Sequence, residues 1–233
     1  MGTRELKKQI FSLLKQPDIG RVLSDIQVFP AKEVVNVLFS AICQVDELLR
    51  WHGISAMGVM VTRLADADLE EGRIIMRRLL WSLNDESGGI GWGAPESMAE
   101  IMHHHEKLSL EYIHMLISYA RPDGQELEQD GNYLEYEILQ RGLLWGFDRL
   151  CERRLGLLVE KGLPGDILPY LRSGDHVVRG LAARLCGRLS IRSARDALQL
   201  LLADHAVITF YQEGEFLERT VGDFAGTALK GLA

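Results

Sequence analysis

A short pattern recurs along this chain and limits the folds that it can adopt. Three segments share a basic residue, a glycine, a large aliphatic residue, a variable position and then Ala or Trp: His52-Gly53-Ile54-Ser55-Ala56, Arg141-Gly142-Leu143-Leu144-Trp145 and Arg179-Gly180-Leu181-Ala182-Ala183. Each comes early in an apolar stretch with helical periodicity. The spacings fit irregular periods of roughly 40 to 47 residues, typical of stacked helical hairpins. The interval between the copies at 52–56 and 141–145 is about two periods long, so one copy of the pattern is missing there. A helix expected from Pro95 onward occupies the middle of this interval.

The rest of the chain also has helical rather than strand periodicity. Leu6, Ile10, Leu13 and Leu14 form one apolar stripe, and a second runs from Val34 to Ile42. Prolines stand between such stripes, where they can begin a helix but not continue one. Gly and Ala at the shared positions would let neighbouring helices approach closely. We therefore predict an all-α fold, a right-handed α-α superhelix (solenoid) of about five helical hairpins.

The last sixty residues of the chain resemble a known family. Residues 175–189 (DHVVRGLAARLCGRL) have an Asp before a helix, a Val-Arg pair, small residues and a closing Gly, and residues 197–204 resemble the helix that follows. In this the chain resembles HEAT repeats, including the phycobilisome-lyase-type subset. That resemblance implies the fold rather than a chemistry. We expect a single repeat domain over 1–233, with an irregular N-terminal cap over 1–45 and repeats over 46–233.

Composition narrows the classes of function. The net charge of -7 argues against a protein that coats nucleic acid. No apolar run is long enough to span a membrane, and the N-terminus lacks the apolar core of a signal peptide. The cysteines, Cys43, Cys151 and Cys186, are odd in number and far apart, unlike a disulfide framework or a zinc site. We therefore expect a cytoplasmic protein.

A glycine-rich stretch, residues 84–96 (NDESGGIGWGAPE), is the least regular part of the chain. No strand precedes it and no Gly-Lys-Ser or Gly-Lys-Thr follows, so a phosphate-binding loop is not indicated. It is either a long turn between two helices, with Pro95 beginning the second, or a functional loop on a rigid scaffold. Within and beside it lie the residues that we predict to contact a partner: Trp81, Asp85, Glu86, Trp92 and Glu96.

The acidic composition of the middle of the chain predicts the charge of the partner. Residues 84–137 contain twelve Asp and Glu but only two Lys and Arg. An acidic surface with exposed Trp side chains suits a basic protein segment, because Trp is favoured where binding energy is concentrated. The same charge disfavours DNA.

Two further sets of residues could form sites. Glu100 with His103, and Glu111 with His114, have the i, i+3 spacing that carboxylate-bridged metal sites use, although the histidine run could equally be a solvated helix end. Arg179, Arg184 and Arg188 lie in a basic C-terminal stretch that could bind an anionic partner. Alternatively, these arginines brace the stack by pairing with Asp of neighbouring repeats.

The sequence favours a scaffold without catalysis or a cofactor, which binds a partner protein through its concave surface and the 84–96 loop. The alternative is a HEAT-like enzyme or ligand-binding protein. Its forms are a metal-dependent oxygenase-like site, a tetrapyrrole-lyase-like cleft and a DNA-glycosylase-like cleft. The last rests on Trp81 and Asp85, four residues apart, which resemble the aromatic and Asp residues of HEAT-like alkylpurine DNA glycosylases.

Overall fold

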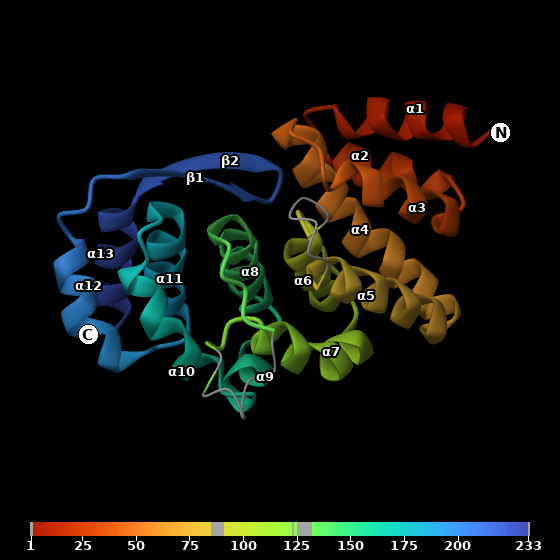
Figure 1. The fold of residues 1–233 in the computed structure, drawn as a ribbon. Helices are drawn as coiled ribbons and strands as arrows, with labels where there is room; N and C mark the ends of the chain where they lie inside the picture. The colour runs from red at the N-terminus through yellow and green to blue at the C-terminus, as the bar shows by residue number, and fades with distance from the viewer. Residues whose placement is uncertain (1, 85–90, 123, 125–131, 233) are drawn as a thin grey trace. The chain divides into compact units, whose positions relative to one another are not determined.

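Helices make up most of the protein in the computed structural model, which describes residues 2–84, 91–122, 124 and 132–232 (Figure 1). In chain order the elements are α1 (Thr3–Leu14), α2 (Ile19–Asp25), η1 (Ile26–Val28), α3 (Ala31–Ala41), α4 (Glu47–Ala67), α5 (Leu69–Leu83), α6 (Ala94–His104), α7 (Glu106–Ser118), α8 (Glu137–Leu150), α9 (Leu155–Glu160), α10 (Leu163–Ile167), η3 (Leu168–Arg172), α11 (His176–Arg188), η4 (Arg192–Ala194), α12 (Arg195–Leu201), β1 (Val207–Gln212), β2 (Glu215–Thr220) and α13 (Val221–Gly231). The all-α fold class is thereby confirmed. No described helix is both long and apolar enough to cross a membrane.

The chain packs as two compact units. The first unit comprises Met1–Tyr112 with Tyr211–Glu215, and the second comprises Ile113–Phe210 with Phe216–Ala233. The boundary falls within α7 and again within the hairpin of β1 and β2. The single repeat domain expected for 1–233 stays a prediction.

Helix α4 is the centre of the first unit, where it packs against α3, α5 and α6. Asp46 caps its N-terminus by accepting a hydrogen bond from the Leu49 backbone N–H at 3.1 Å. Every residue from Trp51 to Gly58 is buried, so neighbours cover the helix on all sides over this stretch. At Gly58 a Cβ atom would lie 3.0 Å from Cβ of Glu100 and 2.9 Å from the ring of His104. At the motif glycine Gly53 a Cβ atom would lie 3.1 Å from Cβ of Ala41 on α3, which is the close approach predicted for the shared position.

Helices α8, α11 and α13 form the core of the second unit. The recurring motif lies within the first three turns of α8 and α11, as it does in α4. Asp175 caps α11 by accepting from the Val178 backbone N–H at 3.0 Å. Gly187 lets α11 approach α13, because a Cβ atom at this position would lie 2.9 Å from Cα of Ala228. The interval between the first two motif copies contains α6, which begins at Ala94 and confirms the helix expected from Pro95.

The two-stranded sheet of β1 and β2 was not predicted. In β1, Ile208 and Phe210 are buried while Val207 and Thr209 are exposed, which is the alternation of a strand. Glu213 and Gly214 link the strands, and both have positive φ, 50° and 93°, as the tight turn of a hairpin requires. Tyr211 stacks on Trp51 of α4 with ring centroids 5.0 Å apart. Tyr211, which belongs to the first unit, therefore covers part of α4.

Candidate functional site

Helix α5 carries the most exposed tryptophan among the described residues. Asp68 caps the helix by accepting from the Glu70 backbone N–H at 3.0 Å, and the opposite face is buried through residues such as Ile75 and Leu79. Trp81 is 65% exposed and Ile74 is 39% exposed. Together with Arg77 and Arg78 they form a surface that we call the α5 stripe (Ile74, Arg77, Arg78, Trp81). Its spacing of three, four and seven residues places these side chains along one side of a helix.

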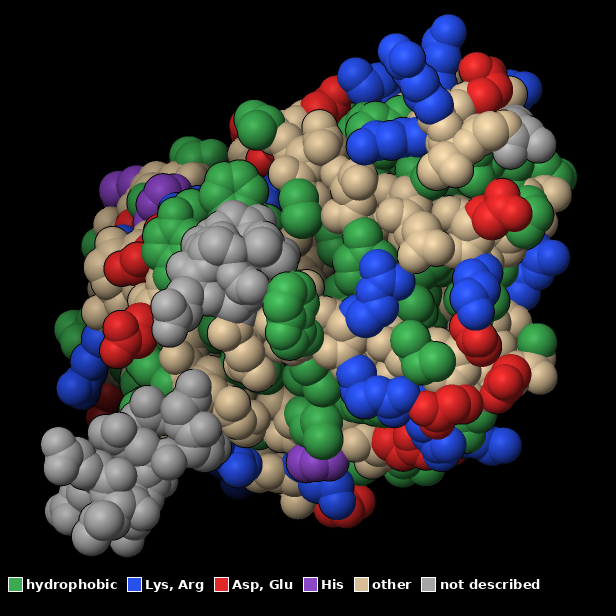
Figure 2. All heavy atoms as spheres, turned by 45° about the vertical axis from the view of Figure 1, so that its right-hand side comes forward, with side chains coloured by type: hydrophobic (Ala, Val, Ile, Leu, Met, Phe, Trp, Pro, Cys, Tyr) green, Lys and Arg blue, Asp and Glu red, His purple; other side chains and the backbone are tan. Residues whose placement is uncertain are grey.

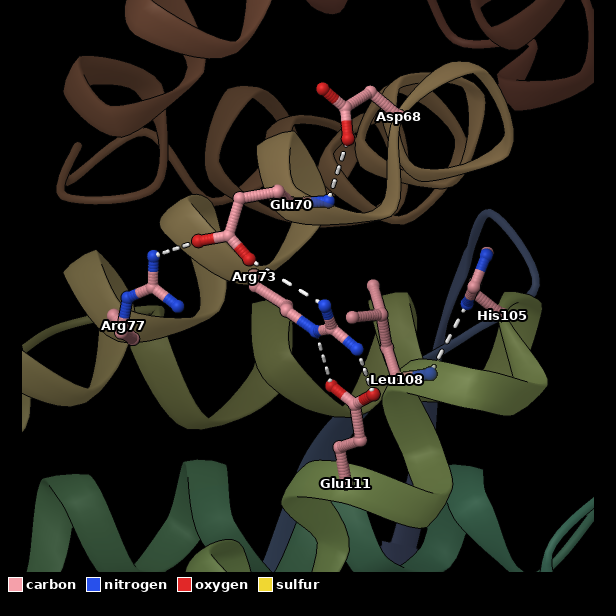
Figure 3. Close-up of polar contacts among 7 residues, drawn as sticks. All are labelled: Asp68, Glu70, Arg73, Arg77, His105, Leu108 and Glu111. Atoms are coloured by element: carbon pink, nitrogen blue, oxygen red, sulfur yellow. Dashed lines mark hydrogen bonds and ion pairs between the residues drawn. The ribbon is translucent and has the colours of Figure 1, made fainter.

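An ion-pair network holds α5 against α7 (Figure 3). Arg73 donates from Nε and Nη2 to the two carboxylate oxygens of Glu111, at 2.8 Å and 2.5 Å. Glu70 contacts both Arg77, at 2.6 Å, and Arg73, at 3.6 Å. The hydrogen bonds from Arg73 lower the pKa of the Glu111 carboxyl, which keeps it ionised. The two-pronged pairing fixes the orientation of α5, so the α5 stripe stands on a rigid support.

The other side of α5 is fixed to α3. The guanidinium carbon of Arg78 lies 4.0 Å from the ring centroid of Phe39, and its Nη1 donates to Oδ1 of Asn36 at 3.0 Å. Lys32 pairs with Glu71 at 2.8 Å. Figure 2 shows basic, acidic and exposed hydrophobic side chains intermingled on one face of the molecule. Because charges of both signs are mixed on this face, it has no broad positive or negative potential. Contacts with individual side chains therefore decide which groups can bind to this face.

The predicted site in the 84–96 loop is only partly described. Helix α5 ends at Leu83, and Asp85 and Glu86 lie outside the described residues. The structure resumes at Gly91, and α6 begins at Ala94 with Pro95 in its first turn, as expected. Gly93 has φ of 74°, and a Cβ atom there would lie 2.6 Å from the carbonyl oxygen of Ile42. Gly93 thus meets both requirements that favour glycine, a left-handed backbone and a close approach.

Trp92 and Glu96 lie deeper than a contact surface. Trp92 is half-buried, and its carbonyl oxygen accepts a weak hydrogen bond from Sγ of Cys43 at 3.6 Å. Glu96 is only 5% exposed, and burial raises the pKa of its carboxyl although the charge of Arg50 opposes the change. No described residue forms a hydrogen bond with Oε2 of Glu96. Glu96 therefore lies buried in the N-terminal turn of α6, and its contact with a partner stays a prediction.

The predicted metal ligands do not form a metal site. Glu100 and His103 are buried on α6, and Oε2 of Glu100 lies 3.4 Å from Nε2 of His104. Both oxygens of Glu111 are bound by Arg73, and His114 is exposed. Among the described residues no group of three or more His, Cys, Asp or Glu side chains could hold a metal ion. The helical spacing was read correctly, but it could not show that arginine already occupies one carboxylate.

The predicted basic patch separates into two arrangements within the second unit. Arg179 of α11 donates to Oδ2 of Asp204 at 2.8 Å and to the carbonyl oxygen of Ser173 at 2.8 Å. Arg141 of α8 likewise pairs with Asp175, with Nε 3.1 Å from Oδ1. These pairs follow the repeat register and match the bracing alternative. We call them the Arg–Asp rungs (Arg141–Asp175 and Arg179–Asp204).

Arg184 and Arg188 converge on one carboxylate instead. Nε of Arg184 lies 2.9 Å from Oδ1 of Asp148, and Nη1 of Arg188 lies 3.5 Å from the same oxygen. The guanidinium carbon of Arg184 is 5.3 Å from the ring centroid of Phe210 and 5.7 Å from that of Phe224. The sequence interpretation overlooked Asp148, an acid four residues after Leu144 on α8. An acid within an apolar helix was the available signal.

Comparison with known proteins shows the fold. No protein-family model matches the chain, and no curated protein matches its sequence. Among solved structures, a designed armadillo repeat protein matches with a TM-score of 0.51 and 15% identity, over 97% of this chain and 99% of the other. A designed armadillo repeat protein in complex with the peptide (KR)4 matches with a TM-score of 0.53 and 16% identity, over 97% and 98%. The chain has an armadillo-like helical repeat fold.

A third similar structure is described only as an engineered protein. This engineered protein matches with a TM-score of 0.52 and 15% identity, over 97% of this chain and 96% of the other. At such low identity the likeness concerns the fold alone. The armadillo-like fold confirms the stacked helical hairpins that the recurring motif predicts.

Proposed function

We propose that this armadillo-like protein is a scaffold that binds a partner protein, and that the α5 stripe is its contact surface in the first unit. The observation that carries the proposal is Trp81, which is 65% exposed on a helix braced on both sides. A large exposed aromatic side chain on a rigid element contributes binding energy at a small cost in conformational entropy. The narrower HEAT resemblance of residues 175–189 agrees with a protein-binding role.

The partner segment that we propose is basic and extended. The exposed acids Asp66 and Asp68 lie just before the N-terminal end of α5, and Trp81 lies near its C-terminal end. Between them, the charge of Arg77 is already paired with Glu70. Twelve residues of helix span about 18 Å, which matches about five or six residues of extended peptide. The ring of Trp81 can accept a Lys or Arg side chain by a cation–π contact. One of the similar structures is a designed armadillo repeat protein in complex with (KR)4, an alternating basic peptide, which supports this partner class.

The inner helix of the first unit is a poorer contact surface. Trp51 to Gly58 of α4 are buried, and Ser55 lies 3.4 Å from the hydroxyl oxygen of Tyr211. A partner would have to displace this packing in order to reach α4. The three free cysteines fit the reducing, cytoplasmic location expected from the sequence.

Fluorescence of Trp81 provides the test. The full chain is titrated with an alternating Lys-Arg octapeptide and, separately, with an alternating Glu-Asp octapeptide. We expect the basic peptide to shift the tryptophan emission saturably, and Trp81→Ala to weaken binding, measured with a dye-labelled peptide, by about 30-fold, the range of a 2 kcal/mol hot spot. Val28→Ala, which trims a side chain that is 79% exposed elsewhere in the first unit, is the matched control.

Two results would contradict the proposal. Equal binding by wild type and Trp81→Ala would remove the α5 stripe as the contact surface. Tighter binding of the acidic peptide would overturn the basic partner class. Circular dichroism of both variants should match the wild type, since exposed side chains contribute little to stability.

A further inference from the structure

Helix α1, at the edge of the first unit, carries a group of basic side chains on its outer side (Figure 1). Its leucine and isoleucine side chains are buried against α2, α3 and α4. Arg4, Lys7 and Lys8 are exposed, and they precede the half-buried Phe11 by seven, four and three residues. Residues at these spacings share one side of a helix. We call this surface the α1 stripe (Arg4, Lys7, Lys8, Phe11).

The positive charges of the α1 stripe are not neutralised within the part of the chain that the structure describes. No ion pair there involves its Arg or Lys side chains, and Nζ of Lys7 lies 5.2 Å from the ring centroid of Phe11. Glu5, the acid of this helix, accepts a hydrogen bond from Nε2 of Gln9 at 3.1 Å. By contrast, Lys15 at the end of α1 is 3.2 Å from Asp46.

These charges do not stabilise α1 either. Arg4 lies in the first turn, where the helix dipole disfavours a positive charge, and the last turn has no basic residue. Arg4 and Lys8 are four residues apart, a spacing at which like charges repel. Local energetics therefore oppose this arrangement, and such departures from local consistency are expected at functional positions.

We propose that the α1 stripe binds an acidic α-helix of a partner protein. From Arg4 to Phe11 the stripe extends about 10 Å along α1, and Glu side chains three and four residues apart on a second helix alongside would match its charges. Phe11 offers apolar surface to the aliphatic parts of those side chains. Helices of a stacked array dock side by side, and the outer side of α1 is available for one more.

The charge of the whole protein favours a short acidic segment over a larger polyanion. A nucleic acid or a membrane surface extends well beyond α1 and would meet the net charge of -7, whereas a single helix contacts the stripe alone. The α1 stripe and the α5 stripe take ligands of opposite charge, so neither proposal requires the other.

The probe is a dye-labelled, alanine-based peptide of about 16 residues, long enough to be helical, with Glu along one side. Its binding to the full chain is followed by fluorescence anisotropy at 0.15 M salt, where distant charges are screened. Lys7→Gln combined with Lys8→Gln should weaken binding at least about tenfold. The control combines Arg21→Gln and Lys32→Gln, which remove the same charge from exposed, paired residues of the same unit, and should change binding less than about twofold.

Further variants and peptides separate this site from the α5 stripe. Lys7→Arg combined with Lys8→Arg should bind the peptide as the wild type does, and so should Trp81→Ala. A peptide of the same composition with Glu spread around the helix should bind at least about fivefold more weakly, and the Glu-Asp octapeptide, too short for a stable helix, at least about tenfold more weakly.

Three results would overturn the proposal. Equal losses in the two pairs of Gln variants would remove the α1 stripe as the site. Equal binding of the two Glu peptides would exclude recognition of a helical face. Tighter binding of duplex DNA or of phosphatidylserine vesicles than of the helical peptide would exclude a protein helix as the ligand. Circular dichroism should show the same helix content in every variant, because all the changed side chains are exposed.

Discussion

The two units use the same motif position in different ways. In the second unit, Arg141 and Arg179 immediately precede the motif glycine, and each pairs with an Asp to form an Arg–Asp rung. In the first unit, His52 has this position; it is fully buried, and its Nδ1–H donates to the carbonyl oxygen of Leu14 at 2.9 Å. In both units the residue before the motif glycine therefore contacts another segment of the chain. In the second unit the contact is a charged pair, and in the first it is a neutral hydrogen bond.

Both units contain buried polar atoms for which no hydrogen bond is found among the described residues, including His52 Nε2 and Glu96 Oε2 in the first unit and Asp148 Oδ1 in the second. In the second unit, the Arg–Asp rungs leave Arg179 and Asp204 about 20% exposed, so water screens the pair. The first unit should respond most to changes that alter packing or the charge of a buried group. The second should respond most to loss of a partner in a rung.

The largest effect is expected from Gly58→Val in the first unit. The new side chain would meet Glu100 and His104 where α4 approaches α6, and overpacking of this kind destabilises by about 3 kcal/mol. Urea denaturation of the full chain followed by circular dichroism measures the change. Gly156→Ala is the control, because nothing lies within 4 Å of its added Cβ atom. A loss below about 1 kcal/mol would show that the α4–α6 contact is loose.

A smaller loss is expected when a rung of the second unit is broken. Arg179→Ala removes the partner of Asp204 and a donor to the Ser173 carbonyl, and should cost about 2 kcal/mol, reduced from the cost of a buried pair by solvent screening. The pairing lowers the pKa of Asp204, so the rung's contribution is present above pH 4 and lost as the pH falls through the folded pKa. Arg192→Ala, with an exposed side chain, should change the unfolding free energy by less than about 0.5 kcal/mol.

Glu96→Gln should stabilise the first unit by about 1 kcal/mol at pH 7. Burial raises the pKa of Glu96, so its protonated form is favoured in the folded protein; stability is present below pH 4.5 and is lost as the pH rises through the folded pKa. The Gln side chain of the variant cannot ionise, so the variant does not lose this stability as the pH rises. Its gain in stability over the wild type should therefore be smaller at pH 4 than at pH 7. Melting temperatures of both proteins at the two pH values measure it. If the variant were stabilised equally at pH 7 and pH 4, titration of Glu96 would not be the cause of the stabilisation.

The smallest effect is the pH dependence contributed by His52. Burial lowers its pKa in the folded protein, so stability is complete above the unfolded value near 6.5 and is lost as the pH falls through the folded pKa. His52→Gln keeps a donor for the Leu14 carbonyl but cannot titrate. The variant should lose about 1 kcal/mol less than wild type between pH 7 and pH 5, measured by urea denaturation. Parallel pH profiles would contradict this account.

Local patterns predicted the helices well but did not show which side chains of the predicted sites are exposed. Apolar residues at helical spacing marked buried faces, and Leu6, Ile10, Leu13 and Leu14 are all buried. The hairpin at 207–220 was missed because its alternation is short, although Val, Ile, Thr, Phe and Tyr before Glu213-Gly214 are typical of a strand and turn. Trp81 was predicted to be a contact residue, and the structure exposes it. Glu96 was predicted on the same grounds but is buried, since a segment's composition does not say which side chains neighbours cover.

The sequence by itself determined the stacked helices, because each depends on periodicity, capping residues and glycines within a few tens of residues. Only the tertiary structure decided which charged groups are available for binding. Arg73 occupies Glu111, Asp204 occupies Arg179, and Asp148 is shared by Arg184 and Arg188. Those pairings join residues far apart in the chain, and an ion pair depends on distances of a few ångströms that no local pattern encodes.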